Sequence, residues 1–285
     1  MTCEVKIIED SLNPSNGIRL TTYQLKYWRG IHSEFMTHRV FSRNASSSRA
    51  IPIKTFLKQI WNDPAGPIHW GSNNAGMQSK EELTGLKKWF AKSMWSFTGK
   101  VVCCLVWLVN TIAKPHKQTF NRMLEPWQYI SVIVTSTDWD NFFELRDHSD
   151  AQPEIQELAR MMKVEYNNST PIIKRYHLPY INKEELLWKE LDKISDSDKE
   201  LDIRTLMKIS AARCARVSYL THDGKSPTIE NDLRLYEQLV GGVPLHASPT
   251  EHQATSIEDS SYIRNFRGWE QHRVVVEQDI IKGMK

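Results

Sequence analysis

Hydrophobic and polar positions follow two different periods along this chain, and together they predict a mixture of strands and helices. β-Branched and aromatic residues dominate 18–28 and 129–137, which predicts two strands. Apolar residues recur every three or four positions in four further segments, which predicts helices at 31–38, 52–61, 83–112 and 153–162. The segment 83–112 is the longest, and we expect it to form one or two helices buried in the core.

Capping and breaking residues mark several of the expected boundaries. Ser79 and Glu82 have the spacing of a capping box, which predicts a helix start just before 83–112. Two more helices are expected later, one ending near 211–219 and one running from 226–227 to 241–242. The polar stretch near 192–202 is the best candidate for a linker. Without internal repeats, this arrangement predicts a helix-rich α/β or α+β fold.

Length and composition favour a single soluble domain, residues 1–285. With 285 residues, 40% of them apolar, the chain can bury a substantial core, and a net charge of +3 is too small for a nucleic-acid coat. Its four cysteines lack metal-ligand spacing, so no metal site is expected. The N-terminus is acidic and the apolar block 101–109 is shorter than a membrane span, which predicts a cytoplasmic protein with no membrane contact.

The segment 36–49 concentrates basic and hydroxyl side chains. It holds His38, Arg39, Arg43 and Arg49 among several serines, and it contains no Asp or Glu. Arginine forks, serine hydroxyls and turn amides together can form a phosphate cradle. The alternative is that the hydroxyls cap turns and the arginines pair with surface acids. A nucleotide phosphate site is therefore one of two interpretations that the residues alone allow.

The run HRVFSRNASSSR resembles the signature HRxxSxNxxSxR of flavin-dependent thymidylate synthases. Six fixed positions match: His38, Arg39, Ser42, Asn44, Ser47 and Arg49. Two further blocks, NRMLEP from Asn121 and NFFELRDHSDAQPEI from Asn141, resemble segments that follow this signature in the family. Three blocks in the same order make a chance match implausible.

Two other family-like segments occur in a different order. ARCARVSY ends at Tyr219 and HASPTEH spans 246–252, whereas the family carries such segments before its signature. A circular rearrangement of the same fold is physically tolerable when the termini lie close together at the surface. The resemblance covers roughly 30–165 and 205–255, and it implies a helix-rich α/β (α+β) single domain with a central mixed sheet.

The resemblance implies a flavoenzyme of pyrimidine nucleotide synthesis. Members of the family bind FAD, take reducing equivalents from NADPH, and transfer a one-carbon unit from methylenetetrahydrofolate to C5 of dUMP, giving dTMP. They use no cysteine nucleophile and work as homotetramers with shared active sites. The apolar helix around 101–109 is a candidate for such an interface, and a bacterial or phage-infected cell is the expected source of such a cytoplasmic enzyme.

The resemblance also implies roles for individual residues. Arg146 and Ser47 would be the catalytic residues, because a guanidinium beside the pyrimidine stabilises the charge that develops as C5 becomes nucleophilic. The nucleotide would be bound by Glu34, Ser47, Ser48, Arg49, Arg122 and Arg146. The flavin would be bound by His38, Arg39, Asn44, Asn141, Ser218, His246 and Ser248. The alternative role for Arg146 is a structural ion pair with Asp147 or Asp150.

Several positions depart from the family pattern. Thr37 replaces an arginine, Thr135 an asparagine, Asp150 a histidine and Glu34 a glutamine, all expected near the pyrimidine or the flavin ring. A carboxylate accepts from an exocyclic amine, so Glu34 or Asp150 would favour cytosine over uracil. Methylation or hydroxymethylation of dCMP or dUMP is therefore an alternative. An alternative of another class is a noncatalytic nucleotide or single-stranded nucleic-acid binder, suggested by ten tryptophans and the basic segment.

Overall fold

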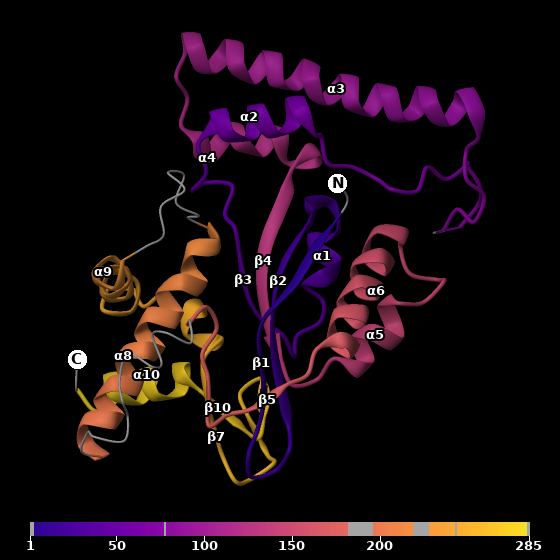
Figure 1. The fold of residues 1–285 in the computed structure, drawn as a ribbon. Coiled ribbons are helices and arrows are strands. Elements are labelled where there is room, and N and C mark those ends of the chain that lie inside the picture. The colour runs from indigo at the N-terminus through magenta and orange to yellow at the C-terminus, as the bar shows by residue number, and fades with distance from the viewer. Residues whose placement is uncertain (1–2, 77, 182–195, 219–227, 243, 284–285) are drawn as a thin grey trace.

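The chain folds around a five-stranded sheet with helices on both faces and across one end (Figure 1). The computed structural model describes residues 3–76, 78–181, 196–218, 228–242 and 244–283, with the backbone alone for 196–202 and 218. The strands follow the order β3-β4-β2-β1-β5. Their bounds are β1 (Glu4–Leu12), β2 (Arg19–Trp28), β3 (Ser42–Ala45), β4 (Tyr129–Ser136) and β5 (Ile172–Ile173).

The sheet is mixed. β1, β2, β4 and β3 pair antiparallel, and β5 adds to β1 in parallel. Smaller sheets join β6 (Tyr176–His177), β7 (Ala254–Ser256) and β10 (Trp269–Gln271), and separately β8 (Tyr262–Ile263) with β9 (Phe266–Arg267). The predicted helix-rich fold with a central mixed sheet is therefore confirmed, and β2 and β4 lie where the sequence places them.

The helices gather in three groups around the sheet (Figure 1). One group comprises α5 (Asp140–Arg146) and α6 (Pro153–Asn168). The opposite group comprises α8 (Asp196–Ala215), α9 (Ile229–Val240) and α10 (His272–Ile281). The third crosses one end with α2 (Ile53–Asn62), α3 (Gly85–Ile112) and α4 (Lys117–Phe120). Short helical turns connect them: η1 (Arg29–Ile31), α1 (His32–Phe35), η2 (Asn121–Trp127), η4 (Arg216–Ser218) and η5 (Ser248–Glu251).

Alternation along β4 explains why both faces of the sheet are covered. Val132 and Val134 pack with the residues of α5 and α6 in the largest core cluster. Ile133, which lies between them in the strand, packs against Cys214 of α8 and Val217 of η4. Successive side chains of a strand point to opposite faces, so an apolar strand such as β4 requires a layer on each side.

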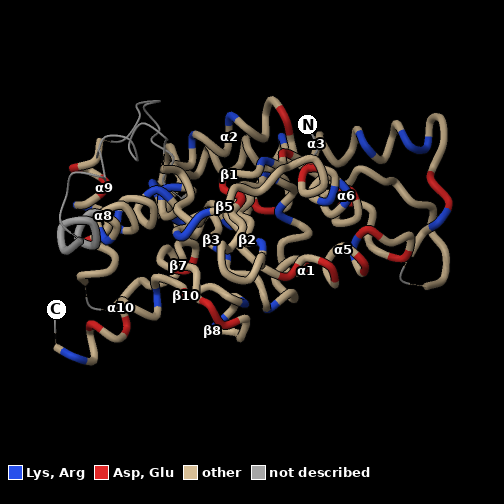
Figure 2. The backbone as a smooth tube through the Cα atoms, turned by 60° about the horizontal axis from the view of Figure 1, so that its bottom comes forward, with Lys and Arg blue, Asp and Glu red and all other residues tan. Residues whose placement is uncertain are grey.

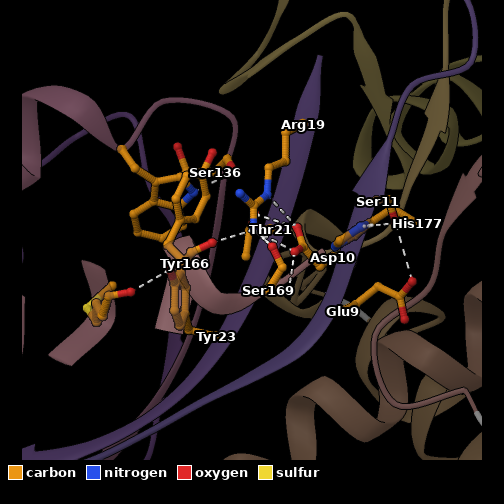
Figure 3. Close-up of polar contacts among 12 residues, drawn as sticks. Glu9, Asp10, Ser11, Arg19, Thr21, Tyr23, Ser136, Tyr166, Ser169 and His177 are labelled. Atoms are coloured by element: carbon orange, nitrogen blue, oxygen red, sulfur yellow. Dashed lines mark hydrogen bonds and ion pairs between the residues drawn. The ribbon is translucent and has the colours of Figure 1, made fainter. Parts of the chain in front are cut away.

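A buried carboxylate joins the β1–β2 hairpin to the end of α6 (Figure 3). Asp10 of β1 accepts hydrogen bonds from Arg19 Nε at 2.9 Å and Nη2 at 2.6 Å, and from Thr21 Oγ1 at 3.0 Å. Ser169, just after α6, also donates to it at 2.5 Å. The Arg19 guanidinium stacks 3.6 Å from the centre of the Tyr166 ring. The ion pair is thus fully hydrogen-bonded, which is the condition for a buried charge to be tolerated.

α3 differs from the sequence expectation of a buried core helix. It is a single helix of 28 residues whose buried side is narrow, with Gly99, Cys103 and Val106 as its buried positions. By length and composition it is the one helix in the described part of the chain that could cross a membrane. Only 17% of its most apolar 18-residue window is buried, which is too little for a core helix. The apolar stretch is thus longer than the block 101–109 on which the expectation of no membrane contact rested.

Two boundary predictions also change. The residue before α3 is Thr84, and its side chain makes no capping hydrogen bond; Ser79 instead donates to the carbonyl of Ser72 at 2.6 Å, so the predicted capping box is wrong. α8 already begins at Asp196, inside the stretch predicted as a linker, whereas 192–195 lie outside the described residues. Local patterns do not distinguish a loop that closes on itself from a helix cap.

Candidate active site

The Arg/Ser segment forms a turn, an edge strand and a second turn. β3 pairs with β4 on one side and ends the sheet order on the other. Before it, the expected helix 31–38 is reduced to η1, α1 and a turn, and Arg43 of β3 donates to the carbonyl of Met36 at 2.8 Å. After it, the amide of Ala50 donates to the carbonyl of Ser47 at 3.0 Å and closes the second turn. β3 therefore has a strand partner on one side only.

Arg146 meets the first turn although more than 100 residues separate them. It is the last residue of α5, and its Nε donates to His38 Nε2 at 2.9 Å. Its Nη1 forms an ion pair with Glu34, and its Nη2 donates to Thr37 Oγ1 at 3.3 Å. The acid that pairs with Arg146 is therefore Glu34. Asp147 instead pairs with Lys163 at 3.0 Å, so the predicted alternative pairing is wrong for that residue.

His38 is neutral in this cluster. Burial, with the charges of Arg146 and Arg43, lowers its pKa to about 4. The ring stacks on Phe41 and meets the edge of Phe142, with ring centres 5.7 and 4.9 Å away. A neutral imidazole has one nitrogen with a lone pair, and here Nε2 accepts from Arg146. The ring thus fixes the direction of the guanidinium.

A second cluster gathers donors around one carboxylate oxygen. Glu125 Oε1 accepts hydrogen bonds from Ser48 Oγ at 3.0 Å and from Arg122 Nη1 at 3.0 Å. Arg29 Nη2 forms an ion pair with the same oxygen at 3.1 Å. The structure thus brings together Ser48 and Arg122, two residues that the resemblance assigns to the nucleotide. The sequence analysis assigned no site role to Arg29 or Glu125. Neither residue lies in the Arg/Ser run, and Glu125 stood out only through its position near Arg122. Two arginines and a hydroxyl that converge on one anionic oxygen have the composition of a phosphate site.

The late segments of the chain contact β3. Asn44 donates to the carbonyl of Cys214 in α8 at 2.8 Å. Ser42 Oγ accepts from Gln271 of β10 at 2.8 Å, and Gln271 also donates to the carbonyl of Glu251 in HASPTEH at 3.3 Å. The family-like segments at the end of the chain therefore lie beside the signature, while the proposed circular rearrangement stays a prediction.

The remaining predicted residues lie at the surface or outside the description. Ser47 is half-buried, and its Oγ accepts from the amide of Arg49 at 3.4 Å, which is the turn-capping role considered as the alternative. The side chain of Ser218 lies outside the described residues. The other predicted site residues are exposed: Arg39, Arg49, Asn141, His246 and Ser248.

Thr135 belongs to the core and not to the site. Its Oγ1 is hydrogen-bonded to Thr22 Oγ1 at 2.7 Å and to His252 Nδ1 at 2.8 Å, and all three residues are fully buried. The expectation that Thr135, in place of an asparagine, lies near the flavin ring is therefore wrong. Its side chain points from β4 toward His252, directly after η5. Asp150, another departure, is exposed beside His148, with Oδ2 to Nδ1 at 3.8 Å.

The four exposed residues that the resemblance assigns to a flavin are polar side chains: Arg39, Asn141, His246 and Ser248. They can donate and accept hydrogen bonds, as binding of a flavin ring and its phosphates requires. Among the described residues no group of three or more His, Cys, Asp or Glu side chains could hold a metal ion.

Comparisons with known proteins give distant matches. No protein-family model and no curated protein matches the sequence. Among solved structures, a UMP/dUMP methylase PolB from Streptomyces cacaoi bound with 5-Br dUMP is 12% identical, with 57% of this chain and 89% of that chain covered and a TM-score of 0.44. A flavin-dependent thymidylate synthase ThyX from Helicobacter pylori complexed with FAD and dUMP is 16% identical, with 52% and 67% covered and a TM-score of 0.36. At these values the functional argument rests on the chain's own residues.

Proposed function

We propose that this protein is a flavin-dependent enzyme that transfers a one-carbon unit from methylenetetrahydrofolate to C5 of dUMP, giving dTMP. The observation that carries the proposal is the Arg146 cluster. The sequence resemblance places Arg146 and Glu34 at the pyrimidine and His38 at the flavin, and the fold joins all three side chains. NADPH as reductant, a homotetramer with shared active sites and a cytoplasmic location complete the proposal.

Arg146 would bind the pyrimidine and stabilise its developing charge. An arginine has five N–H donors, and three of them are engaged by His38, Glu34 and Thr37, which leaves two (five minus three) without a partner among the described residues. A pyrimidine carbonyl that accepts from these donors gains stabilisation as C5 becomes nucleophilic and negative charge moves onto its oxygen. Because His38 and Thr37 already hold the guanidinium, little reorganisation accompanies the reaction.

The nucleotide phosphate would bind at the Glu125 cluster. Arg29, Arg122 and Ser48 already face one carboxylate oxygen, so a phosphate can replace that oxygen with the same donors. Arg49 and the Ser47 hydroxyl border the same turn and would add contacts from the solvent side.

FAD, when bound, would supply the redox chemistry of methyl formation. Arg39, Asn141, His246 and Ser248 would hold it, with Asn44 and Ser218 as further predicted contacts. The role of this chain is to position the group and to keep His38 neutral beside it, because burial lowers the pKa of this histidine to about 4.

A second candidate substrate is dCMP, and the Glu34 carboxylate favours it. Glu34 lies against the guanidinium that would face the base, so acceptor and donor are adjacent. Cytosine offers the matching pair, an amino donor next to a ring nitrogen acceptor. The product in this case would be a methylated or hydroxymethylated cytosine nucleotide.

Product mass tests the proposal. Protein with FAD, NADPH and methylenetetrahydrofolate is incubated separately with dUMP and dCMP, and the nucleotides are analysed by mass spectrometry. We expect a methyl gain on dUMP that is strongly reduced in Arg146→Lys and retained in Arg160→Lys. Arg160 is an exposed arginine on α6 that pairs with Glu157. Gain on dCMP alone supports the second candidate, and Glu34→Gln should then shift turnover toward dUMP. No gain on either nucleotide refutes both.

A further inference from the structure

Arg43 is a half-buried arginine with which no carboxylate among the described residues forms an ion pair. Glu34 is already paired with Arg146. Glu251, whose charge acts on Arg43 through space, is already paired with Arg273. Basic and acidic residues are interspersed around the central sheet (Figure 2), so the charge of Arg43 is not part of a broad basic surface. A charge withdrawn from water costs free energy unless an opposite charge balances it.

The position of Arg43 in β3 places its guanidinium beside the first turn of the site. Its cross-strand partner Val134 packs with α5 and α6, so Arg43 lies on the face of the sheet that carries the Arg146 cluster. The guanidinium donates to the carbonyl of Met36, just after α1. Together with burial and the charge of Arg146, its charge lowers the pKa of His38. Arg43 is therefore a neighbour of a residue that the resemblance assigns to the flavin.

One edge of the Arg43 guanidinium has no partner among the described residues. Nη1 donates to the carbonyls of Met36 at 2.8 Å and Phe35 at 3.4 Å, which leaves three of the five N–H donors, on Nε and Nη2 (five minus two). Burial lowers the pKa of Arg43, and the opposing effects of Tyr27 and Glu251 offset this only in part. The surroundings thus disfavour the charge, while the open edge has the fork that binds two oxygens of one phosphate.

A ligand with a formal negative charge would balance Arg43. Among the ligands of the proposed reaction, dUMP and FAD are the two to which the resemblance assigns residues of this chain. The phosphate of dUMP already has the Glu125 cluster. FAD carries a pyrophosphate, whereas its oxidised ring is neutral. Arg43 belongs to the flavin side of the site, because it lies beside His38, directly precedes Asn44 and is within electrostatic reach of Glu251 in η5.

We propose that Arg43 binds the pyrophosphate of FAD through its Nε and Nη2 donors. The inference rests on the proposed function and adds a residue to which the resemblance assigned no role. Thr37, which stands in place of an arginine, directly follows Met36. Arg43 thus supplies from β3 a cation that the turn itself lacks. The alternative is that Arg43 only caps the carbonyls at the end of α1.

Binding of FAD by Arg43→Gln tests the inference. Glutamine can still donate to the carbonyl of Met36 but carries no charge. FAD affinity, measured by flavin fluorescence during titration of the purified protein, should fall at least tenfold. Arg43→Lys keeps the charge without the fork and should lie between Arg43→Gln and the wild type. Arg160→Gln removes an exposed arginine paired with Glu157, and as the control for net charge it should bind FAD like the wild type.

Two other ligands identify the group that Arg43 binds. Calorimetry should show that the affinity for dUMP changes less than twofold in Arg43→Gln. Loss of dUMP affinity with unchanged FAD affinity would assign Arg43 to the nucleotide phosphate and overturn the inference. Riboflavin, which has the ring without phosphates, should not distinguish the wild type from Arg43→Gln. A tenfold loss for riboflavin as well would place Arg43 at the ring and overturn the assignment to the pyrophosphate.

Stability separates ligand binding from a structural role. Arg43→Gln removes a half-buried charge that no ion pair balances, so without FAD the midpoint of its urea unfolding should be at or above that of the wild type. A lower midpoint with unchanged FAD affinity would mean that Arg43 only caps α1, and the inference would be wrong. A wild type that binds no FAD would refute the flavin-dependent function itself. Equal FAD affinity in the wild type and Arg43→Gln would refute this inference alone.

Discussion

Acid should destabilise this protein through a buried chain of hydroxyls and imidazoles. Ser11 Oγ lies 2.9 Å from His177 Nδ1 (Figure 3), and His177 Nε2 lies 2.7 Å from Thr22 Oγ1. The chain continues through Thr135 to His252, and all five residues are fully buried. Burial lowers the pKa of His252 to about 3 and that of His177 well below its ordinary value. These contacts join β1, β2, β4 and β6 to the segment after η5.

The magnitude follows from proton linkage. An unfolded histidine takes a proton near pH 6.5, whereas folded His252 stays neutral down to about pH 3. Between these values the unfolded state binds one more proton, so stability is fully present above pH 6.5 and falls by about 1.4 kcal/mol per pH unit for each such histidine. From pH 6.5 to 5 the loss is about 2 kcal/mol for His252. The lowered pKa of His177 adds a loss of the same sign.

Urea unfolding across this pH range measures the effect. His252→Gln keeps an amide that can hydrogen-bond to Thr135 but cannot take a proton. It should therefore reduce the slope of the unfolding free energy against pH by about 1.4 kcal/mol per pH unit. The variant will be less stable than the wild type near pH 8, yet the difference should narrow by about 2 kcal/mol near pH 5. His177→Gln is the parallel test. A slope that is unchanged in both variants would refute the argument.

Three further changes test the site and the fold. Arg146→Lys keeps a charge near Glu34 but loses the fork, so turnover should fall about 100-fold, measured as product per enzyme; a change within twofold would contradict the proposed role. Glu125→Gln removes the carboxylate that competes with a phosphate, and calorimetry should show several-fold tighter dUMP binding; weaker binding would mean that Glu125 orders its arginines instead. Asp10→Ala leaves the Arg19 charge buried without its partner and should cost about 3–5 kcal/mol in urea unfolding; a cost below about 1 kcal/mol would contradict the burial of this pair.

Part of the site could be predicted from the sequence, because the spacing of neighbouring residues determines which of them lie together. Residues 38–49 are consecutive, so their order alone predicts that they lie together in one turn, one strand and a second turn. Arg146 could be connected to it only through the resemblance, and in the structure Arg146 contacts the signature at His38. Arg29 and Glu125 could not be predicted in this way, because their contact with Ser48 depends on how η1, η2 and the second turn pack. Each is an ordinary surface residue in sequence.

The sequence by itself determined the type of most elements. β2, β4, α2 and α6 lie where their apolar periods place them, because a period of two or 3.6 residues is a local property. Tertiary structure decided which apolar faces are covered. α3 has apolar residues on two sides, and a period cannot say which side meets the core; packing against α2 and η2 buries one side and leaves the other exposed. The same reason placed Thr135 in the core, since only pairing of β4 with β2 and contact with His252 decided which way its side chain points.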